Sequence, residues 1–183
     1  ELTDEGLLVR LQGVGTFVAE PKGQSALFEI RSIADEINAR QHQHRCEVLT
    51  LERTQANAQQ ALVLNVKEGT PIFHSIMVHY ENDLPVQIED RCVNAEIVPE
   101  YLAQDYSQTT PHAYLSLIAP LTEGEHIVEA VRASAEECAL LKIKEHDPCL
   151  LIRRKTWSAS SIVSHARLLF PGSRYRLQGR FMS

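Results

Sequence analysis

The sequence predicts an α+β domain in which helices flank one antiparallel sheet, and three observations lead to this fold class. Two long segments, 71–93 and 149–170, each read as a pair of strands joined by a polar loop. A short helical segment precedes each pair, at 57–66 and 134–142. The two helix–hairpin units also align with each other, which predicts one sheet with an internal two-fold repeat.

Length and composition fit one large domain, or one domain with a fragment of another. The chain has 183 residues, 44% of them hydrophobic, and its first residue is Glu1, so we expect it to be a fragment. No apolar run approaches the ~18–20 residues of a membrane span, and the acidic start ELTDEG is unlike a signal peptide. A net charge of −6 argues against a chain that binds DNA phosphates without another domain. We expect a cytoplasmic protein without a membrane partner.

The chain opens with two β-type runs, GLLVRL and TFVAE, around Q-G-V-G. Gly13 and Gly15 can adopt the positive φ angles of a tight turn, so a hairpin is expected here. The polar, turn-rich segment 21–25 follows and reads as a linker. Helical spacing covers 27–40, with Ser32 as an N-cap, and CEVLTLERT reads as a strand.

The connecting and closing segments are assigned in the same way. Residues 95–121 have a mixed pattern, with helical turns expected near Tyr101 and over His112–Ile118. HIVEAVRA reads as a strand, and Ser134 with Glu137 matches the S-x-x-E capping box of a helix N-terminus. RYRLQGRFM is expected to be the last strand.

An internal repeat relates the two halves of the chain. AQQALVLNVKEGTPI at 58–72 aligns without gaps with AEECALLKIKEHDPC at 135–149. Five identities recur at matching positions: Ala58/Ala135, Leu64/Leu141, Lys67/Lys144, Glu68/Glu145 and Pro71/Pro148. Two copies are too few for a solenoid. Two related halves of one sheet would instead leave a groove between them that suits a small ligand.

The chain offers little for a metal or a cofactor. Its four cysteines are widely spaced and lack a C-x-x-C pair, which favours reduced thiols over a zinc site or a disulfide framework. His42, His44 and Cys46 have the alternate spacing of ligands on one strand face. They lie in the polar segment HQHRCE, so a solvated loop is the favoured interpretation. Neither a metal nor a cofactor is predicted.

Three stretches resemble the GntR superfamily of bacterial repressors, in its HutC-type branch. EGLLVRLQGVGTFVAEP resembles the wing and exit strand of a winged helix-turn-helix, ENDLPVQIEDR resembles a turn–Pro–strand–Glu signature, and PGSRYRLQGRF resembles a closing strand. The resemblance implies a wing remnant at 1–20, the linker at 21–25, and a UTRA effector-binding domain of chorismate-lyase-like fold at 26–183.

The resemblance implies that operator DNA is bound by an N-terminal domain of which only the wing is present. Arg10, Gln12 and Gly13 would be its DNA-contacting residues. The chain is therefore not expected to read a DNA sequence alone. It is expected to form a homodimer and to bind an effector that favours one dimer arrangement, so that the attached DNA-binding domains leave the operator.

The resemblance also places a ligand site on the sheet between the two halves. Relatives that bind phosphorylated sugars have two arginines where this sequence has Met77 and His79, so a sugar phosphate is not expected. Glu89 stands at the position of the family's acidic ligand-binding residue. The repeat matches Met77 with Arg154, which could supply a charge from the opposite half. The other candidate ligand residues are His112, Tyr114, Ser164 and Phe170.

Within the HutC-type branch, the resemblance is to regulators of histidine breakdown, and it implies urocanate as the effector. Urocanate joins a planar imidazole to an acrylate carboxylate. An arginine or a histidine would hold the carboxylate, and Glu89 would accept a hydrogen bond from the ring N–H. Tyr114 or Phe170 would cover the flat conjugated surface.

Each candidate residue also has a purely structural interpretation. Glu89 on a strand is by default part of a solvent-facing ion pair, His79 a core histidine, and Tyr114 an aromatic at the edge of the core. Three other functions stay open: a chorismate-lyase-like enzyme, a GntR-type sensor of another carboxylated or sugar metabolite, and a dimerisation module without a ligand. The enzyme alternative is weakened because the chain contains no nucleophile–base motif such as G-x-S-x-G.

Overall fold

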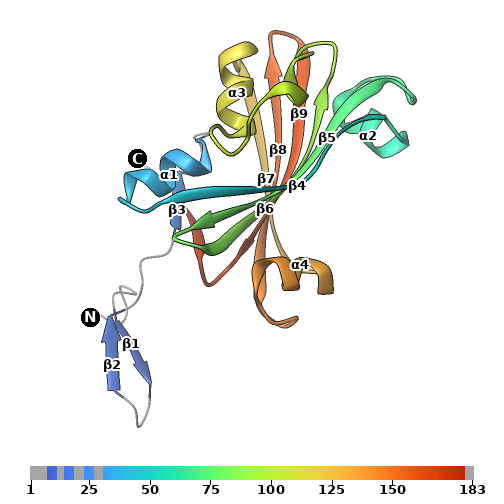
Figure 1. The fold of residues 1–183 in the computed structure, drawn as a ribbon. Helices are drawn as coiled ribbons and strands as arrows, with labels where there is room; N and C mark the ends of the chain where they lie inside the picture. The colour runs from blue at the N-terminus through green and yellow to red at the C-terminus, as the bar shows by residue number, and fades with distance from the viewer. Residues whose placement is uncertain (1–7, 12–14, 19–22, 27–30, 180–183) are drawn as a thin grey trace, which may run out of the picture.

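The computed structural model describes residues 8–11, 15–18, 23–26 and 31–179, with side chains from 31 onward. Its centre is one antiparallel six-stranded sheet, shown in Figure 1. In spatial order, the strands are β4 (His44–Gln55), β5 (Pro71–Glu81), β6 (Leu84–Asn94), β9 (Ser161–Pro171), β8 (Pro148–Ser158) and β7 (Glu123–Arg132). The predicted fold class and both predicted long hairpins are confirmed.

Helices cover both faces of the sheet, as Figure 1 shows. One face carries α1 (Ile33–Ala39), the short 3₁₀ helix η1 (Tyr101–Ala103) and α3 (Pro111–Ile118). The opposite face carries α2 (Ala58–Leu64) and α4 (Ala135–Leu141). Buried hydrophobic clusters lie beneath both layers, so the sheet is the shared wall of two half-cores.

The two helices on that opposite face begin and end alike. Asn57 and Gln60 form a capping box on α2, and Ser134 and Glu137 form the predicted one on α4. Each helix has a C-cap residue with a left-handed backbone conformation, Asn65 after α2 and Lys142 after α4. The gapless alignment places these two residues at matching positions. The order strand–helix–strand–strand also recurs, as β4-α2-β5-β6 and β7-α4-β8-β9. The two-fold relation between the halves stays a prediction of that alignment.

The hairpins have well-defined turns. Asn82 and Asp83 join β5 to β6 with φ angles of 47° and 65°, the positive-φ pair of a type I′ turn, in which Asn and Asp are favoured. The register of β7 on β8 is continuous, whereas β4 has a bulge between Val48 and Thr50. Register decides which side chains meet on each face, and it therefore positions the site described below.

The N-terminal segments form two small additional sheets. β1 (Leu8–Leu11) and β2 (Gly15–Val18) pair as the predicted hairpin, while its turn residues Gln12 and Gly13 lie outside the described residues. β3 (Gly23–Ala26) pairs in parallel with β10 (Tyr175–Gln178), which confirms the predicted last strand over those four residues. The predicted linker at 21–25 thus ends in a strand, because backbone pairing with β10 outweighs the turn-rich composition of this segment.

Ser32 is the N-cap of α1, as predicted, and its side chain accepts a hydrogen bond from the backbone N–H of Ala34 at 3.3 Å. The helix begins at Ile33. The first part of the predicted helix, 27–30, lies outside the described residues.

Two leucines of α2 offer a matched test of this packing. The side chain of Leu64 is 1% exposed, whereas that of Leu62 is 79% exposed. Leu64→Ala is expected to lower the free energy of unfolding by about 2–5 kcal/mol because it opens a cavity under the sheet. Leu62→Ala should change it by less than about 0.5 kcal/mol. Urea denaturation measures both, and equal effects would contradict the placement of α2.

Candidate functional site

A row of buried polar side chains crosses one face of the sheet. Strand alternation places the side chains of β6 residues 87, 89 and 91 on the face covered by α1, η1 and α3. The register puts further buried polar groups on the same face: Ser75, His79, Arg154, Thr156 and Ser164. Buried polar side chains are costly unless they are paired, so such a concentration marks a candidate site.

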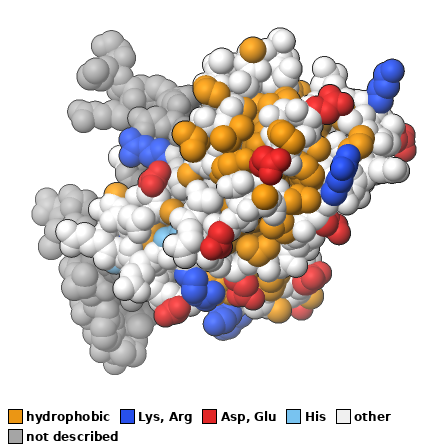
Figure 2. Space-filling view, turned by 45° about the horizontal axis from the view of Figure 1, so that its top comes forward, with side chains coloured by type: hydrophobic (Ala, Val, Ile, Leu, Met, Phe, Trp, Pro, Cys, Tyr) orange, Lys and Arg blue, Asp and Glu red, His pale blue; other side chains and the backbone are white. Residues whose placement is uncertain are grey.

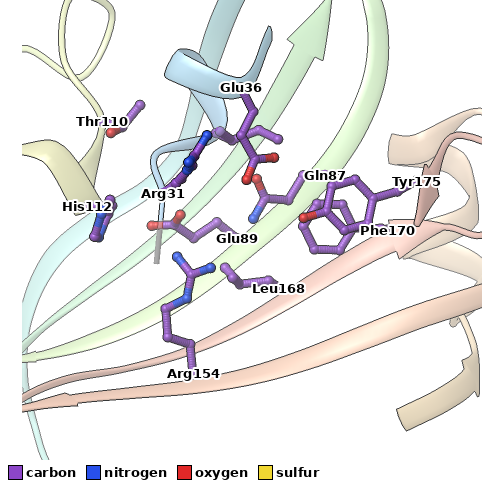
Figure 3. A pocket seen from close by; sticks show the side chains of 11 residues that line it. Arg31, Glu36, Gln87, Glu89, Thr110, His112, Arg154, Leu168, Phe170 and Tyr175 are labelled. Carbon is purple, nitrogen blue, oxygen red and sulfur yellow. The ribbon is translucent and has the colours of Figure 1, made fainter. Parts of the chain in front are cut away.

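A recess opens over this row, between the sheet and α1. The space between its walls is about 320 Å³ when the open solvent at its mouth is included, but the part that admits the centre of a water molecule is only about 10 Å³. Residues from α1, β6, β8, β9, β10 and the start of α3 line it, as Figure 3 shows. The lining residues are Arg31, Ile33, Glu36, Gln87, Glu89, Thr110, His112, Arg154, Leu168, Phe170 and Tyr175.

Glu89 is the buried anion of the recess. Its Oε1 accepts a hydrogen bond from Arg91 Nε at 2.7 Å, and its Oε2 lies 3.7 Å from His79 Nε2. The second distance is too long for a hydrogen bond. Burial raises the pKa of Glu89, but the Arg91 guanidinium and His79 outweigh burial and hold the pKa well below its usual range. Glu89 is therefore ionised.

Arg91 lies beneath the recess and connects Glu89 to the second hairpin. It is 1% exposed, and its Nη1 donates to Ser164 Oγ at 2.8 Å. Ser164 in turn shares a 2.9 Å hydrogen bond with Thr156 Oγ1. This chain of contacts crosses β6, β9 and β8 and holds the Glu89 carboxylate in place.

Arg154 is the second buried cation, and it is 7% exposed. Its Nε donates to His126 Nε2 at 2.8 Å, and among the described residues its two terminal nitrogens form no hydrogen bond and no ion pair. Figure 3 shows the guanidinium pointing toward the same space as the Glu89 carboxylate. Burial and repulsion from Arg91 lower the pKa of Arg154 to about 10, so Arg154 is charged at neutral pH.

Arginines outnumber carboxylates among the described residues around the recess. The cations Arg31, Arg91 and Arg154 surround it against the carboxylates Glu36 and Glu89. Arg91 and Glu89 are bonded to each other, whereas the terminal nitrogens of Arg154 face the open space and form no hydrogen bond with a described residue. A planar guanidinium with two free terminal nitrogens is suited to bind a carboxylate through two parallel hydrogen bonds.

The upper wall of the recess joins two helix N-termini. Ser32 is the N-cap of α1 and Thr110 the N-cap of α3, and their hydroxyl groups share a buried hydrogen bond of 2.9 Å. Opposite them, the rings of Phe170 and Tyr175 stack with centroids 3.8 Å apart. The recess therefore has a polar wall at the helix starts and a flat apolar wall at β9 and β10.

The structure brings some of the predicted ligand residues together and leaves others apart. Glu89, His112, Arg154 and Phe170 line the recess. Met77, His79, Tyr114 and Ser164 lie outside its lining.

Met77 is opposite Glu89 in register, but Tyr101 and Leu115 pack into the same hydrophobic cluster and close it off. Tyr114 packs against Tyr101, with ring centroids 6.4 Å apart. Ser164 is bonded to Arg91 beneath the recess. His79 is fully buried, and its Nδ1 is 3.0 Å from His44 Nε2.

The residues spaced like metal ligands do not converge. His42 Nδ1 bonds Glu81 Oε1 at 2.6 Å, whereas His44 bonds His79. Cys46 lies in the hydrophobic core, where burial raises the pKa of its thiol to about 12. No cluster of three metal-ligating side chains occurs within the part of the chain that the structure describes. In that part, too, each helix is too short or too polar to cross a bilayer.

Sequence reasoning missed several residues of the site. Gln87, Glu89 and Arg91 alternate along β6, which is the one signal that could have added Gln87 and Arg91 to the candidates. Arg31 comes from the segment just before α1, Glu36 from α1, and Tyr175 from β10. These three meet the sheet only through long-range packing, for which the sequence carries no local signal.

Comparison with known proteins places this geometry in a family. A family model for the UTRA domain matches residues 39–176. Over 183 residues the chain is 81% identical to a histidine utilization repressor from Klebsiella aerogenes, and the match covers all of this chain and 76% of that protein. The chain belongs to the UTRA family, in the branch of the histidine utilization repressors. It is therefore a ligand-sensing domain of a repressor and not an enzyme.

Other relatives agree with this assignment. A histidine utilization repressor from Pseudomonas aeruginosa is 64% identical over the whole chain, which spans 73% of that protein. The crystal structure of the C-terminal domain of the histidine utilization repressor from Pseudomonas syringae superposes with a TM-score of 0.74 at 57% identity, covering 77% of this chain and 100% of that one. PhnF from Mycobacterium smegmatis shares the fold at 21% identity and a TM-score of 0.88, covering 100% of this chain and 81% of that one.

The buried Glu89 should make the stability of this UTRA domain depend on acid. Its pKa is depressed by folding, so its stabilising contribution is complete above the ordinary glutamate pKa of ~4.3 and is lost as pH falls toward the depressed value. Glu89→Gln should therefore flatten the loss of unfolding free energy in acid, whereas Glu123→Gln on exposed β7 should leave it unchanged. Urea titrations across acidic pH measure this, and an unaltered acid dependence in Glu89→Gln would contradict an ionised Glu89.

Proposed function

We propose that this domain senses urocanate in the recess and thereby controls a repressor of histidine utilisation genes. The observation that carries the proposal is the buried Arg154, whose terminal nitrogens face the recess without a carboxylate partner among the described residues. The carboxylate of urocanate would occupy this position through two parallel hydrogen bonds. Glu89, ionised nearby, would accept from the ring N–H.

The walls of the recess fit a flat conjugated ligand. Phe170 and Leu168 form an apolar side, and Tyr175 stacks on the Phe170 ring. A planar ligand could bury one face of its π-system against such a wall. Histidine utilization repressor is also the name of the relatives at 81% and 64% identity, and urocanate is the first intermediate of histidine breakdown.

The lost arginine pair argues against a sugar phosphate. Met77 is fully buried in the hydrophobic cluster under η1 and α3, and His79 is fully buried with its Nδ1 3.0 Å from His44 Nε2. Neither offers a second cation beside Arg154. A sensor of another small carboxylate is the alternative that the same observation favours, because Arg154 recognises the carboxylate and not the ring.

Effector binding would act on the DNA-binding domain through α1. Ile33 and Glu36 at the start of α1 line the recess, as does Arg31 just before this helix, which follows the segment from the wing hairpin. Ser32 ties this start to Thr110 of α3. A ligand held between Arg154 and α1 would favour one position of α1, and a differential affinity of this kind is what shifts a two-state equilibrium.

Because a repressor works on the chromosome, the cytoplasm is its proposed location.

Exposed hydrophobic side chains support a homodimer. On α3, Leu117 is 77% and Ile118 is 48% exposed, and on β7 Ile127 is 48% exposed. Figure 2 shows a face on which hydrophobic side chains gather. Monomeric proteins seldom expose large apolar areas. Sedimentation equilibrium at micromolar concentration should give the mass of two chains, and a single-chain mass would contradict the dimer.

Substitutions of two adjacent arginines on β8 distinguish a specific loss of urocanate binding from the general effect of removing a positive charge. Arg154→Met should weaken the calorimetric affinity for urocanate about tenfold or more, since a hydrogen bond to a charged group contributes about 1.5–3 kcal/mol. Arg153→Met is the matched control, because Arg153 points to the other face, is 40% exposed and bonds Glu129.

The full-length repressor carrying Arg154→Met should also stay on operator DNA when urocanate is added. Glucosamine 6-phosphate serves as the competing ligand and should not bind the wild-type domain. Tight binding of the sugar phosphate alone would contradict the proposed effector. An unchanged urocanate affinity in Arg154→Met would contradict the proposed site.

A further inference from the structure

We propose that His126 is a positioning residue for the effector, and that it orients Arg154 to receive a carboxylate. The inference rests on the proposed function of the recess. His126 lies on β7, an edge strand whose other side chains are exposed except for the half-buried Val131. The register places His126 directly opposite Arg154, and Arg154 Nε donates to His126 Nε2 at 2.8 Å.

This hydrogen bond decides which edge of the guanidinium is available. A guanidinium offers two edges to a carboxylate: the side edge, with Nε and one terminal nitrogen, and the end edge, with both terminal nitrogens. His126 occupies Nε, so the side edge is blocked and the end edge faces the recess. Because the group is planar, holding Nε also restricts rotation of the whole guanidinium, which reduces the entropy that ligand binding would otherwise cost.

The contact requires one protonation state of His126. Arg154 is charged at neutral pH and can only donate, so His126 Nε2 accepts and carries no proton. His126 is therefore neutral, with its proton on Nδ1. A protonated imidazole would direct an N–H at the N–H of Arg154 and add a second positive charge beside it. Protonation of His126 would thus release Arg154, and effector affinity would fall in acid.

The ionisable groups around this pair lie on both faces of the sheet. On the recess face, those that act on Arg154 are Arg91, Glu89, Tyr175 and Glu36. On the opposite face, alternation along β7 and β8 places Glu125, Glu129, Arg153 and Lys155, of which Glu129 is bonded to Arg153. Arg154 is directly hydrogen-bonded to His126, and its positive charge therefore opposes a positive charge on His126.

Two substitutions separate positioning from a structural role. His126→Gln keeps an acceptor oxygen for Arg154 Nε but does not titrate, and His126→Leu removes the acceptor. Calorimetry with urocanate at neutral pH should show an affinity about tenfold weaker for His126→Leu, the loss of one hydrogen bond to a charged group. His126→Gln should restore most of that affinity.

The pH dependence provides the second readout. From mildly alkaline to mildly acidic pH, the affinity of the wild type should fall relative to that of His126→Gln. The comparison cancels the titration of urocanate itself, which is common to both proteins. Equal affinities of the wild type and His126→Leu, or parallel pH profiles of the wild type and His126→Gln, would overturn the role of His126 while leaving the urocanate site intact.

A measurement without ligand distinguishes failure of this inference from failure of the proposed function. The ¹⁵N spectrum of the imidazole groups in the ligand-free domain, with His126→Gln for assignment, should show His126 protonated at Nδ1 and unprotonated at Nε2. A protonated Nε2 would overturn the inference whether or not urocanate binds. The expected tautomer without any urocanate binding would instead refute the proposed effector.

Discussion

The buried ion pair between Glu89 and Arg91 is the interaction on which the recess depends. Glu89 and Arg91 are 3% and 1% exposed, and their charged atoms approach to 2.7 Å. Removing two charges from water costs several kcal/mol per ion, and a buried pair is therefore weak evidence for stability. The consequence of this pair is electrostatic, because Arg91 neutralises the charge of Glu89. Among the described residues, no carboxylate is bonded to Arg154, so its positive charge is not offset by such a contact.

This arrangement explains why the site is polar beneath and apolar at one side. The contacts from Arg91 to Ser164 and Thr156 lock the floor across three strands, so the floor is preorganised before a ligand arrives. The stacked rings of Phe170 and Tyr175 supply a surface for a flat ligand. In the proposed function, the part that would respond to a ligand is the upper wall at α1, where Ser32 and Thr110 join two helix starts.

The sequence predicted the fold well because its signals are local. Alternation over 71–93 and 149–170 and the capping box at Ser134 each involve neighbours along the chain, and each element formed where expected. The site was predicted in part. Glu89 was found through a family signature and Arg154 through the repeat. Met77 was predicted to be at the ligand site, but it lies outside the recess, because η1 and α3 cover that half of the sheet and their packing has no local signal.

The central claim is that the recess receives a carboxylate on Arg154 and a ring N–H on Glu89. A crystal structure of this domain with urocanate tests it most directly. The account predicts both carboxylate oxygens within hydrogen-bond distance of the terminal nitrogens of Arg154, the ring against Phe170, and a ring nitrogen at the Glu89 carboxylate. Urocanate bound elsewhere, or bound with its carboxylate away from Arg154, would contradict it.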